Sequence, residues 1–183
     1  MKLFMVLIGC KPKGRHTEQH DVFFGVANEL KELIPAFEKF WPEAKGKMHV
    51  DGYRVVHAVN GYTVSIVPKS ENTQVSIARL FFINLGGYKK DELEEFHYKM
   101  VVAAENKSDA IAFSKQTAFF KHTHFEGANS HIDDKYGIDV DDLYEIQEIL
   151  DPVSSSKYHV LLTKDSSAEE DTLQLGYFKL SEL

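Results

Sequence analysis

The segment HTEQHDVFFGVANEL, residues 16–30, decides the fold, because it returns in altered form 77 positions later in the chain. The two copies share residue types at matching positions, and the residues before and after them match as well. The matched pairs are Glu18 with Glu95, His20 with His97, and Ala27 with Ala104. We therefore predict a tandem duplication of one structural unit.

The first unit begins with two strands. Residues 2–10 form a continuous apolar run that is too short for an amphipathic helix and suits a strand buried on both faces. A turn is expected next, because Pro12 removes a backbone donor and Gly14 permits a positive φ. Residues 19–27 then place apolar side chains on alternate positions, which is typical of a second strand.

A helix and a hairpin complete the first unit. Asn28 is a favourable N-cap, and apolar residues at helical spacing follow it. Pro35 is expected to bend or break this helix, because it removes a backbone hydrogen bond. Residues 48–59 and 62–67 read as strands joined at Asn60-Gly61, a pair that favours a two-residue type I′ turn.

The second unit is predicted to follow the same β-β-α-β-β course. A five-residue insertion after its helix shifts the correspondence between the copies. His131-Ile132-Asp133 then matches His49-Val50-Asp51, and Asp141-Asp142 replaces the Asn60-Gly61 turn. The residues that recur in both copies are therefore mostly apolar, with a few polar exceptions.

The expected organisation is two repeat units and a C-terminal hairpin in one compact body. The units span residues 1–67 and 78–150, a linker covers 151–156, and the hairpin covers 157–183. The predicted fold class is α+β, with mainly antiparallel sheet covered by helices. Within each unit, the strand–helix–strand connection favours a right-handed parallel crossover.

Composition excludes several classes of protein. The chain has 183 residues, a formal net charge of −7 and a pI near 5.7, so it lacks the basic face that nucleic acids and anionic membranes need. A single cysteine, Cys10, excludes an internal disulfide framework and fits a reducing compartment. No apolar run approaches the ~18 residues of a membrane helix. We expect a cytoplasmic protein with no nucleic-acid or membrane partner.

The first copy resembles a known family. The resemblance is carried by GCKPKGRHTEQHDVFF, residues 9–24, with the apolar strand before it and His49-Val50-Asp51 after it. It is similar to the family catalogued as domain of unknown function 1543, closely in the first copy and loosely in the second. The resemblance implies a small soluble bacterial protein that carries one or two such units, with no assigned activity.

The polar residues that recur in both copies are candidate metal ligands. In each pair the two side chains are two residues apart and project from one face of a strand. If the second and third strands run parallel, both pairs lie near the same edge of the sheet. Imidazole and carboxylate groups suit a divalent transition metal. The eight candidates are Glu18, His20, His49, Asp51, Glu95, His97, His131 and Asp133.

A structural explanation of these residues stays open, since a carboxylate also fixes the tautomer of a neighbouring imidazole. The basic turn of Lys11, Lys13 and Arg15 suits an anion by charge and backbone amides, although a solvated turn is the preferred explanation. Cys10 lies at the end of a predicted buried strand, which favours a role as a small core residue over a role as a nucleophile.

Three functional interpretations remain. The sequence favours a binding or interaction module, with an unknown protein or small molecule as its ligand, over an enzyme. The alternative is a metal-dependent, hydrolytic enzyme that uses the paired histidines and carboxylates. A third interpretation is a homodimer that buries an apolar sheet face. No cofactor is predicted apart from the divalent transition metal of the alternative.

Overall fold

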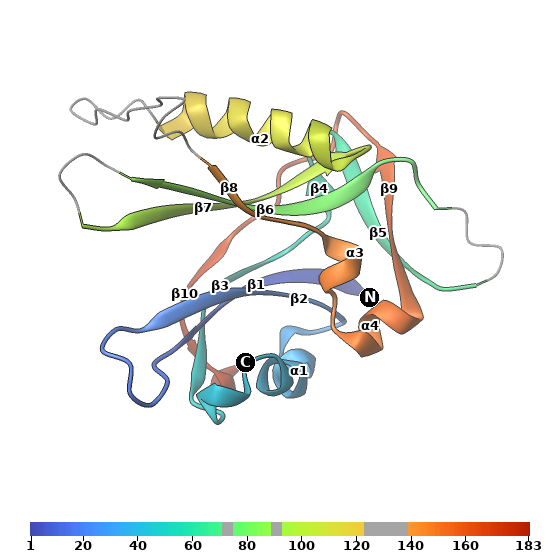
Figure 1. Cartoon of the computed structure of the whole chain (residues 1–183). Coiled ribbons are helices and arrows are strands. Elements are labelled where there is room, and N and C mark those ends of the chain that lie inside the picture. Colours follow the sequence, from blue (N-terminus) through green and yellow to red (C-terminus); the bar gives the residue numbers. More distant parts are fainter. Residues whose placement is uncertain (71–74, 89–92, 123–138) are drawn as a thin grey trace. The chain divides into compact units, whose positions relative to one another are not determined.

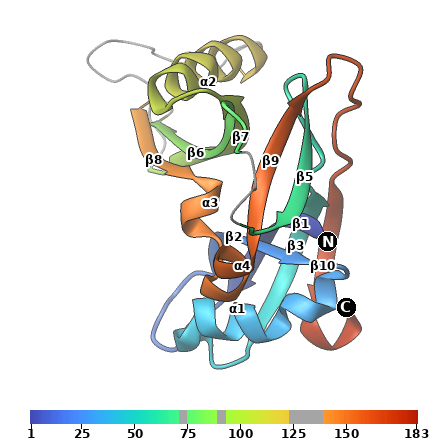
Figure 2. The same ribbon diagram turned by 90° about the vertical axis from the view of Figure 1, so that its right-hand side faces the viewer.

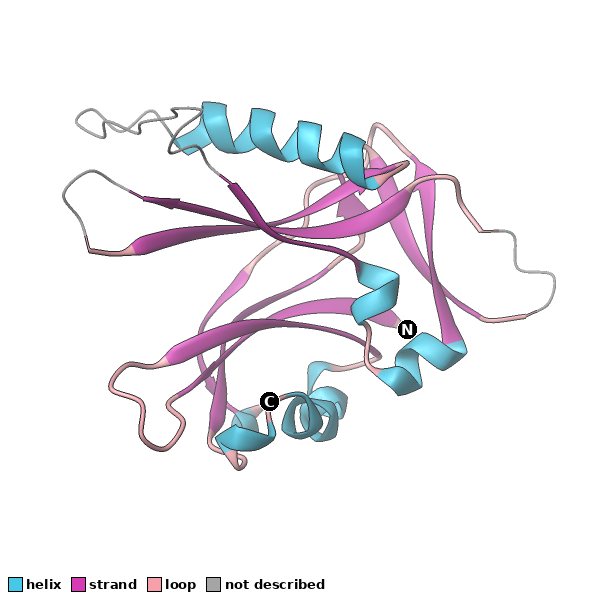
Figure 3. Ribbon diagram, in the orientation of Figure 1, coloured by secondary structure: helices cyan, strands magenta, loops and turns pink. Residues whose placement is uncertain are grey.

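The computed structural model describes residues 1–70, 75–88, 93–122 and 139–183. These residues form two compact units. Unit 1 comprises Met1–Ser76 and Gln147–Leu183, and unit 2 comprises Ile77–Ile146. The described strand pairings are antiparallel and helices accompany the sheets, so the fold class is α+β (Figures 1 and 3). None of the helices in these ranges is both long and apolar enough to cross a membrane.

The main sheet of unit 1 has the strand order β10-β3-β1-β2. Its strands are β1 (Lys2–Cys10), β2 (Gln19–Ala27), β3 (Met48–Val55) and β10 (Gln174–Lys179). β1 pairs antiparallel with both β2 and β3. β2 and β3 therefore run parallel to each other, as predicted, but β1 separates them.

One face of this sheet forms the core of unit 1. Phe4, Val6 and Ile8 of β1 are buried at alternate positions. They pack in one cluster with Leu33 and Phe37, which come from the helical segment after β2. The period-two burial explains why the apolar run of residues 2–10 forms a central strand rather than a helix.

The helical segment is broken, as Pro35 predicts. It consists of η1 (Leu30–Leu33), α1 (Ile34–Phe40) and η2 (Pro42–Ala44), with Pro35 in the first turn of α1. The predicted N-cap was wrong. Glu29 occupies that position without a side-chain cap bond, and the backbone N–H of Asn28 instead donates to Glu32 Oε2 at 2.9 Å.

A second sheet of unit 1 has the order β4-β5-β9. β4 (Ala58–Val59) and β5 (Tyr62–Pro68) form the predicted hairpin, because Asn60 and Gly61 have φ values of 34° and 85°. β9 (Tyr158–Lys164) lies beside β5 along its whole length (Figure 2).

The C-terminal segment corrects two sequence predictions. β9 and β10 do not form a hairpin with each other, since β9 pairs with β5 and β10 pairs with β3. Residues 151–156 are not a plain linker, because α4 (Pro152–Lys157) follows α3 (Ile146–Ile149) and precedes β9, and η3 (Leu180–Glu182) ends the chain. Asp151 caps α4 by accepting from Val153 N at 3.0 Å and Ser154 N at 3.1 Å.

The described part of unit 2 contains a three-stranded sheet and one long helix. The sheet has the order β7-β6-β8, from β6 (Arg79–Tyr88), β7 (Glu95–Ala104) and β8 (Asp139–Glu145). α2 (Lys107–His122) covers it and contributes Ala110 to a core with Phe81 and Val102 (Figure 1). Asn106 Oδ1 accepts from Asp109 N at 3.0 Å and caps the helix.

The register of unit 2 corrects the predicted correspondence between the copies. β6 pairs with β8 as β1 pairs with β3, and both ladders have an irregularity at corresponding steps, Leu7/Ile8 and Asn84/Leu85. In this register Asp139 pairs with Gly86, as His49 pairs with Gly9, and His131 lies outside the described residues. Asp141-Asp142 lies inside a strand and is not a turn.

Candidate metal site

Gly9 of β1 is the centre of a polar cluster at one end of the main sheet of unit 1. It pairs with His20 of β2 on one side and with His49 of β3 on the other. Because both neighbours are antiparallel to β1, the beginnings of β2 and β3 meet at this end. The two imidazoles therefore come from the strands that flank Gly9.

A β-bulge adds a carboxylate to the cluster. Leu7 pairs with Gly52 and Ile8 with Val50, so Asp51 is the extra residue between them. Such a residue is left outside the ladder, and its side chain is re-aimed relative to a regular strand. Asp51 consequently lies against both histidines.

The four side chains Glu18, His20, His49 and Asp51 come together. Asp51 Oδ2 lies 3.1 Å from His20 Nε2, and Asp51 Oδ1 lies 3.2 Å from His49 Nε2. Glu18 Oε1 lies 3.4 Å from His49 Nε2, and Glu18 Oε2 lies 4.0 Å from His20 Nε2. Ligand atoms of Glu18, His20 and His49 all lie within 4.8 Å of one another.

These separations fit the size of a transition metal ion. A tetrahedral ion with bonds of ~2.0–2.2 Å has its ligand atoms about 3.3–3.6 Å apart. The observed nitrogen–oxygen separations of 3.1 to 4.0 Å lie around this range. Small side-chain rotations would therefore complete such a coordination shell.

His49 is the most constrained member of the cluster. It is only 5% exposed, and its ring stacks on Tyr177 of β10 with centroids 4.3 Å apart. His49 Nε2 and Asp51 Oδ2 are buried and make no hydrogen bond within the described residues. Both atoms lie 3.1–3.4 Å from a charged or imidazole group of the cluster without hydrogen-bond geometry, so a bound cation would give them a well-directed partner.

Gly9 is required for this packing. A Cβ atom at Gly9 would overlap the His49 imidazole and the Asp51 carboxylate. Glycine inside a strand often marks such a close approach. Neither Gly9 nor Tyr177 was among the predicted site residues, although a glycine within an apolar strand was a usable signal for the first.

Residues 15–66 match the model of the family described as Domain of Unknown Function (DUF1543). The predicted resemblance to DUF1543 is thus confirmed. The matched segment contains Glu18, His20, His49 and Asp51, and lies within unit 1. No curated protein matches the chain.

A similar fold is found in the crystal structure of protein Il1583 from Idiomarina loihiensis. The two chains are 22% identical, with a TM-score of 0.66. The alignment covers 98% of this chain and 97% of that chain, so the likeness includes the DUF1543 segment and unit 2. At this identity the likeness concerns the fold alone.

The predicted ligands outside the DUF1543 segment are only partly described. His131 and Asp133 lie outside the described residues, and of Glu95 only the backbone, in β7, is described. His97 is described, and its Nδ1 lies 3.4 Å from Asp141 Oδ2. The carboxylate beside His97 is therefore one that the sequence comparison had assigned to a turn.

Two further predictions concern the DUF1543 segment and the strand before it. Lys11, Lys13 and Arg15 are exposed in the loop between β1 and β2, so anion binding there stays a prediction. Cys10 is buried. Burial raises the pKa of its thiol, and the negative charge of Glu18 raises it further. A protonated thiol is a poor nucleophile, which favours a core role for Cys10.

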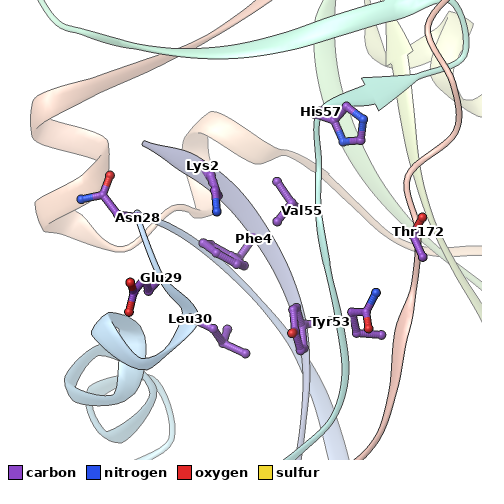
Figure 4. Close-up of a pocket in the computed structure, with 10 residues that line it drawn as sticks. Lys2, Phe4, Asn28, Glu29, Leu30, Tyr53, Val55, His57 and Thr172 are labelled. Atoms are coloured by element: carbon purple, nitrogen blue, oxygen red, sulfur yellow. The ribbon is translucent and has the colours of Figure 1, made fainter. Parts of the chain in front are cut away.

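A pocket of about 410 Å³ lies at the opposite end of β1, near Lys2, Phe4 and Tyr53 (Figure 4). His57 lies at its edge, and Asp171 Oδ1 accepts from His57 Nδ1 at 2.6 Å; the Asp171 side chain is fully buried. Asp171 also accepts from the backbone N–H groups of His57 and Ala58. The sequence analysis missed Asp171, whose partners are remote in the chain.

Proposed function

We propose that this protein binds a divalent transition metal ion in unit 1, through Glu18, His20, His49 and Asp51. Two imidazoles and two carboxylates form a donor set that suits Zn²⁺ and its neighbours in the transition series. The observation that carries the proposal is the buried His49 Nε2, which lies 3.2 Å and 3.4 Å from two carboxylate oxygens and makes no hydrogen bond to any residue that the structure describes.

In this proposal the protein is a binding protein, and its ligand is a metal ion. Glu18 and His20 are nearly half exposed, whereas His49 is held between Gly9 and Tyr177. An ion would thus enter from the side of Glu18 and His20 and meet a preset His49. Preorganised ligands reduce the conformational entropy that binding costs.

Zn²⁺ is expected to raise the melting temperature of the protein by about 5–10 °C at a hundredfold excess over its Kd, since mass action then adds ~2.7 kcal/mol to the stability of the native state. Differential scanning calorimetry with Zn²⁺, Mn²⁺ and Ni²⁺ measures this shift. His20→Ala should abolish most of this shift, because it removes one of the two imidazole ligands. The His20 side chain is 40% exposed, so its loss should leave the core intact.

His159→Ala is the matched control. His159 lies on β9 in the other sheet of unit 1, so its loss should leave the Zn²⁺ shift unchanged. The absence of a shift with all three ions, together with no loss of stability in a chelator, would contradict the proposal.

Metal-dependent hydrolysis is a second candidate. It is favoured by the exposure of Glu18 and His20, which leaves one side of a bound ion open to water. A zinc-bound water ionises near neutral pH and becomes a nucleophile. Zn²⁺-loaded protein should then cleave 4-nitrophenyl acetate or 4-nitrophenyl phosphate faster than His20→Ala does, and equal rates would exclude this candidate.

Tandem duplication is also part of the proposal. It is supported by the same strand order in the two sheets, β3-β1-β2 and β8-β6-β7, and by bulges at corresponding steps. An experimental structure tests it, because Gly9 and Gly86 should coincide when the units are superposed. If β1 and β6 occupied different positions in their units, the two copies would be unrelated.

A further inference from the structure

The pocket of about 410 Å³ lies in unit 1, at the opposite end of β1 from the candidate metal site. The described residues that line it all belong to that unit. Small-molecule sites in proteins have volumes of about 300–1,000 Å³ and combine apolar walls with a few polar groups. The size of this pocket therefore suits a small organic ligand rather than a single ion.

Aromatic rings form the apolar wall of the pocket. Phe4 of β1 is buried, and its ring lies against that of Tyr53 of β3, with centroids 6.4 Å apart. Val55 lines the pocket as well, and Figure 4 shows Phe4 between Lys2 and Tyr53. Ring surfaces of this kind favour contact with an apolar or aromatic group of a ligand.

Two polar side chains, Lys2 and His57, reach the pocket from neighbouring strands. Val56 N donates to Leu3 O at 2.8 Å, which continues the antiparallel register of β1 and β3 beyond the last residue of β3. The next residues in this register are Lys2 and His57. Both line the pocket, so a single ligand can meet both of them (Figure 4).

Asp171 fixes the His57 ring at the pocket. The buried Asp171 Oδ1 accepts from His57 Nδ1 at 2.6 Å, and also from the backbone N–H groups of His57 and Ala58. A carboxylate oxygen accepts and does not donate, so His57 Nδ1 carries a hydrogen and is already occupied. His57 Nε2 is therefore the ring nitrogen that is left for a ligand.

Lys2 gives the pocket a positive charge. The described lining contains one carboxylate, that of Glu29, which is already paired with Lys31 at 2.7 Å. Lys2 itself forms no ion pair with any residue that the structure describes. Its ammonium group is thus available to an anionic ligand, although the chain as a whole has a net charge of −7.

From these features we propose that the pocket binds a small organic acid that has an apolar body and a hydroxyl group. Lys2 pairs with the carboxylate of this ligand, and Phe4 and Tyr53 contact its apolar body. His57 Nε2 forms a hydrogen bond with the hydroxyl group, which both donates and accepts and so suits either protonation state of that nitrogen. This site goes beyond the proposed metal binding and does not need the metal ion.

Saturation-transfer difference NMR on the full chain tests the proposal, with 3-phenyllactate and 4-hydroxyphenylacetate as probes. These two acids differ in the distance between the carboxylate and the hydroxyl group. At least one should bind saturably, with a Kd in the millimolar range or tighter. Its binding should be about three- to tenfold tighter than that of the same acid without the hydroxyl group, 3-phenylpropionate or phenylacetate. The protein is first freed of metal with a chelator and dialysed, so that a metal ion cannot hold the acid.

Variants of the two polar side chains separate their roles. Lys2→Gln should weaken binding by about tenfold or more, because it removes the charged partner of the carboxylate. Lys69→Gln is the charge-matched control at an exposed position outside the described lining, and should leave the affinity unchanged. His57→Ala should abolish the preference for the hydroxylated acid while the acid without a hydroxyl group still binds. A purely structural role of His57 would not produce this difference between ligands.

Three results would overturn the proposal: neither probe binds saturably, Lys2→Gln keeps the affinity of the natural chain, or His57→Ala keeps the preference for the hydroxyl group. If circular dichroism shows that His57→Ala does not fold, the imidazole NMR signals of His57 in the natural chain must shift when the probe is added. Zn²⁺ calorimetry reports on the metal site separately, so failure of either site is distinguished from failure of the other.

Discussion

Val6→Asp is expected to unfold unit 1. Val6 is fully buried on the central strand and packs in the core cluster with Phe23 and Phe37. An unpaired carboxyl group in such a place costs several kcal/mol, which is a large part of the 5–15 kcal/mol that stabilises a typical domain. Far-UV circular dichroism with urea titration measures the loss.

The matched control for this change is Val153→Asp. It makes the same substitution at a side chain that is 54% exposed, in the first turn of α4, where an acidic group is tolerated. Its unfolding midpoint should stay close to that of the natural chain. The expectation would be contradicted if Val6→Asp unfolded cooperatively with a urea midpoint within a few tenths of a molar of that of the natural chain. This result would show that β1 is not central to unit 1.

Gly9→Ala should weaken Zn²⁺ binding by about 10–100-fold, the range found when groups that orient metal ligands are altered. The added methyl group would overlap the His49 ring and the Asp51 carboxylate. His49 has little room to move away, because Tyr177 stacks on it. Isothermal titration calorimetry gives the affinity, and thermal melting shows whether the fold remains.

Gly25→Ala separates an effect on the site from an effect on the sheet. Gly25 is also a strand glycine, but a Cβ atom there would meet the Phe23 ring at 2.6 Å and Leu33 at 2.9 Å, in the core. This variant should melt at a lower temperature and bind Zn²⁺ with unchanged affinity. If Gly9→Ala instead bound Zn²⁺ with unchanged affinity, Gly9 would not be required for the site.

Local patterns in the sequence predicted the first half of unit 1 well. The apolar run of residues 2–10 became β1, and Asn60-Gly61 formed a tight turn with positive φ at both residues. The sequence also anticipated that Glu18, His20, His49 and Asp51 would lie near one edge of the sheet, because parallel strand direction depends only on neighbouring elements; the bulge that positions Asp51 was not anticipated. Each of these features is decided by short stretches of chain.

Remote pairings could not be predicted in the same way. β9 and β10 are adjacent in sequence and resemble a hairpin, but each is paired with a strand from the first 70 residues. Tyr177 reaches His49 only through this pairing. The pairing of residues 139–145 with β6 could not be read from residue types either, which favoured His131-Ile132-Asp133, outside the described residues, as the counterpart of His49-Val50-Asp51.

The division of unit 1 between the two ends of the chain sets the order of events during synthesis. Residues 77–146 of unit 2 leave the ribosome as one continuous piece and already contain all three strands of their sheet. Unit 1 lacks β9, β10 and the buried Asp171 until residues 158–179 have been synthesised, after the whole of unit 2. Asp171 reaches back 114 residues to the backbone of His57. Unit 1 therefore begins before unit 2 and is completed after it, and a ribosome that stalls before Tyr158 leaves β3 and β5 without their partners β10 and β9.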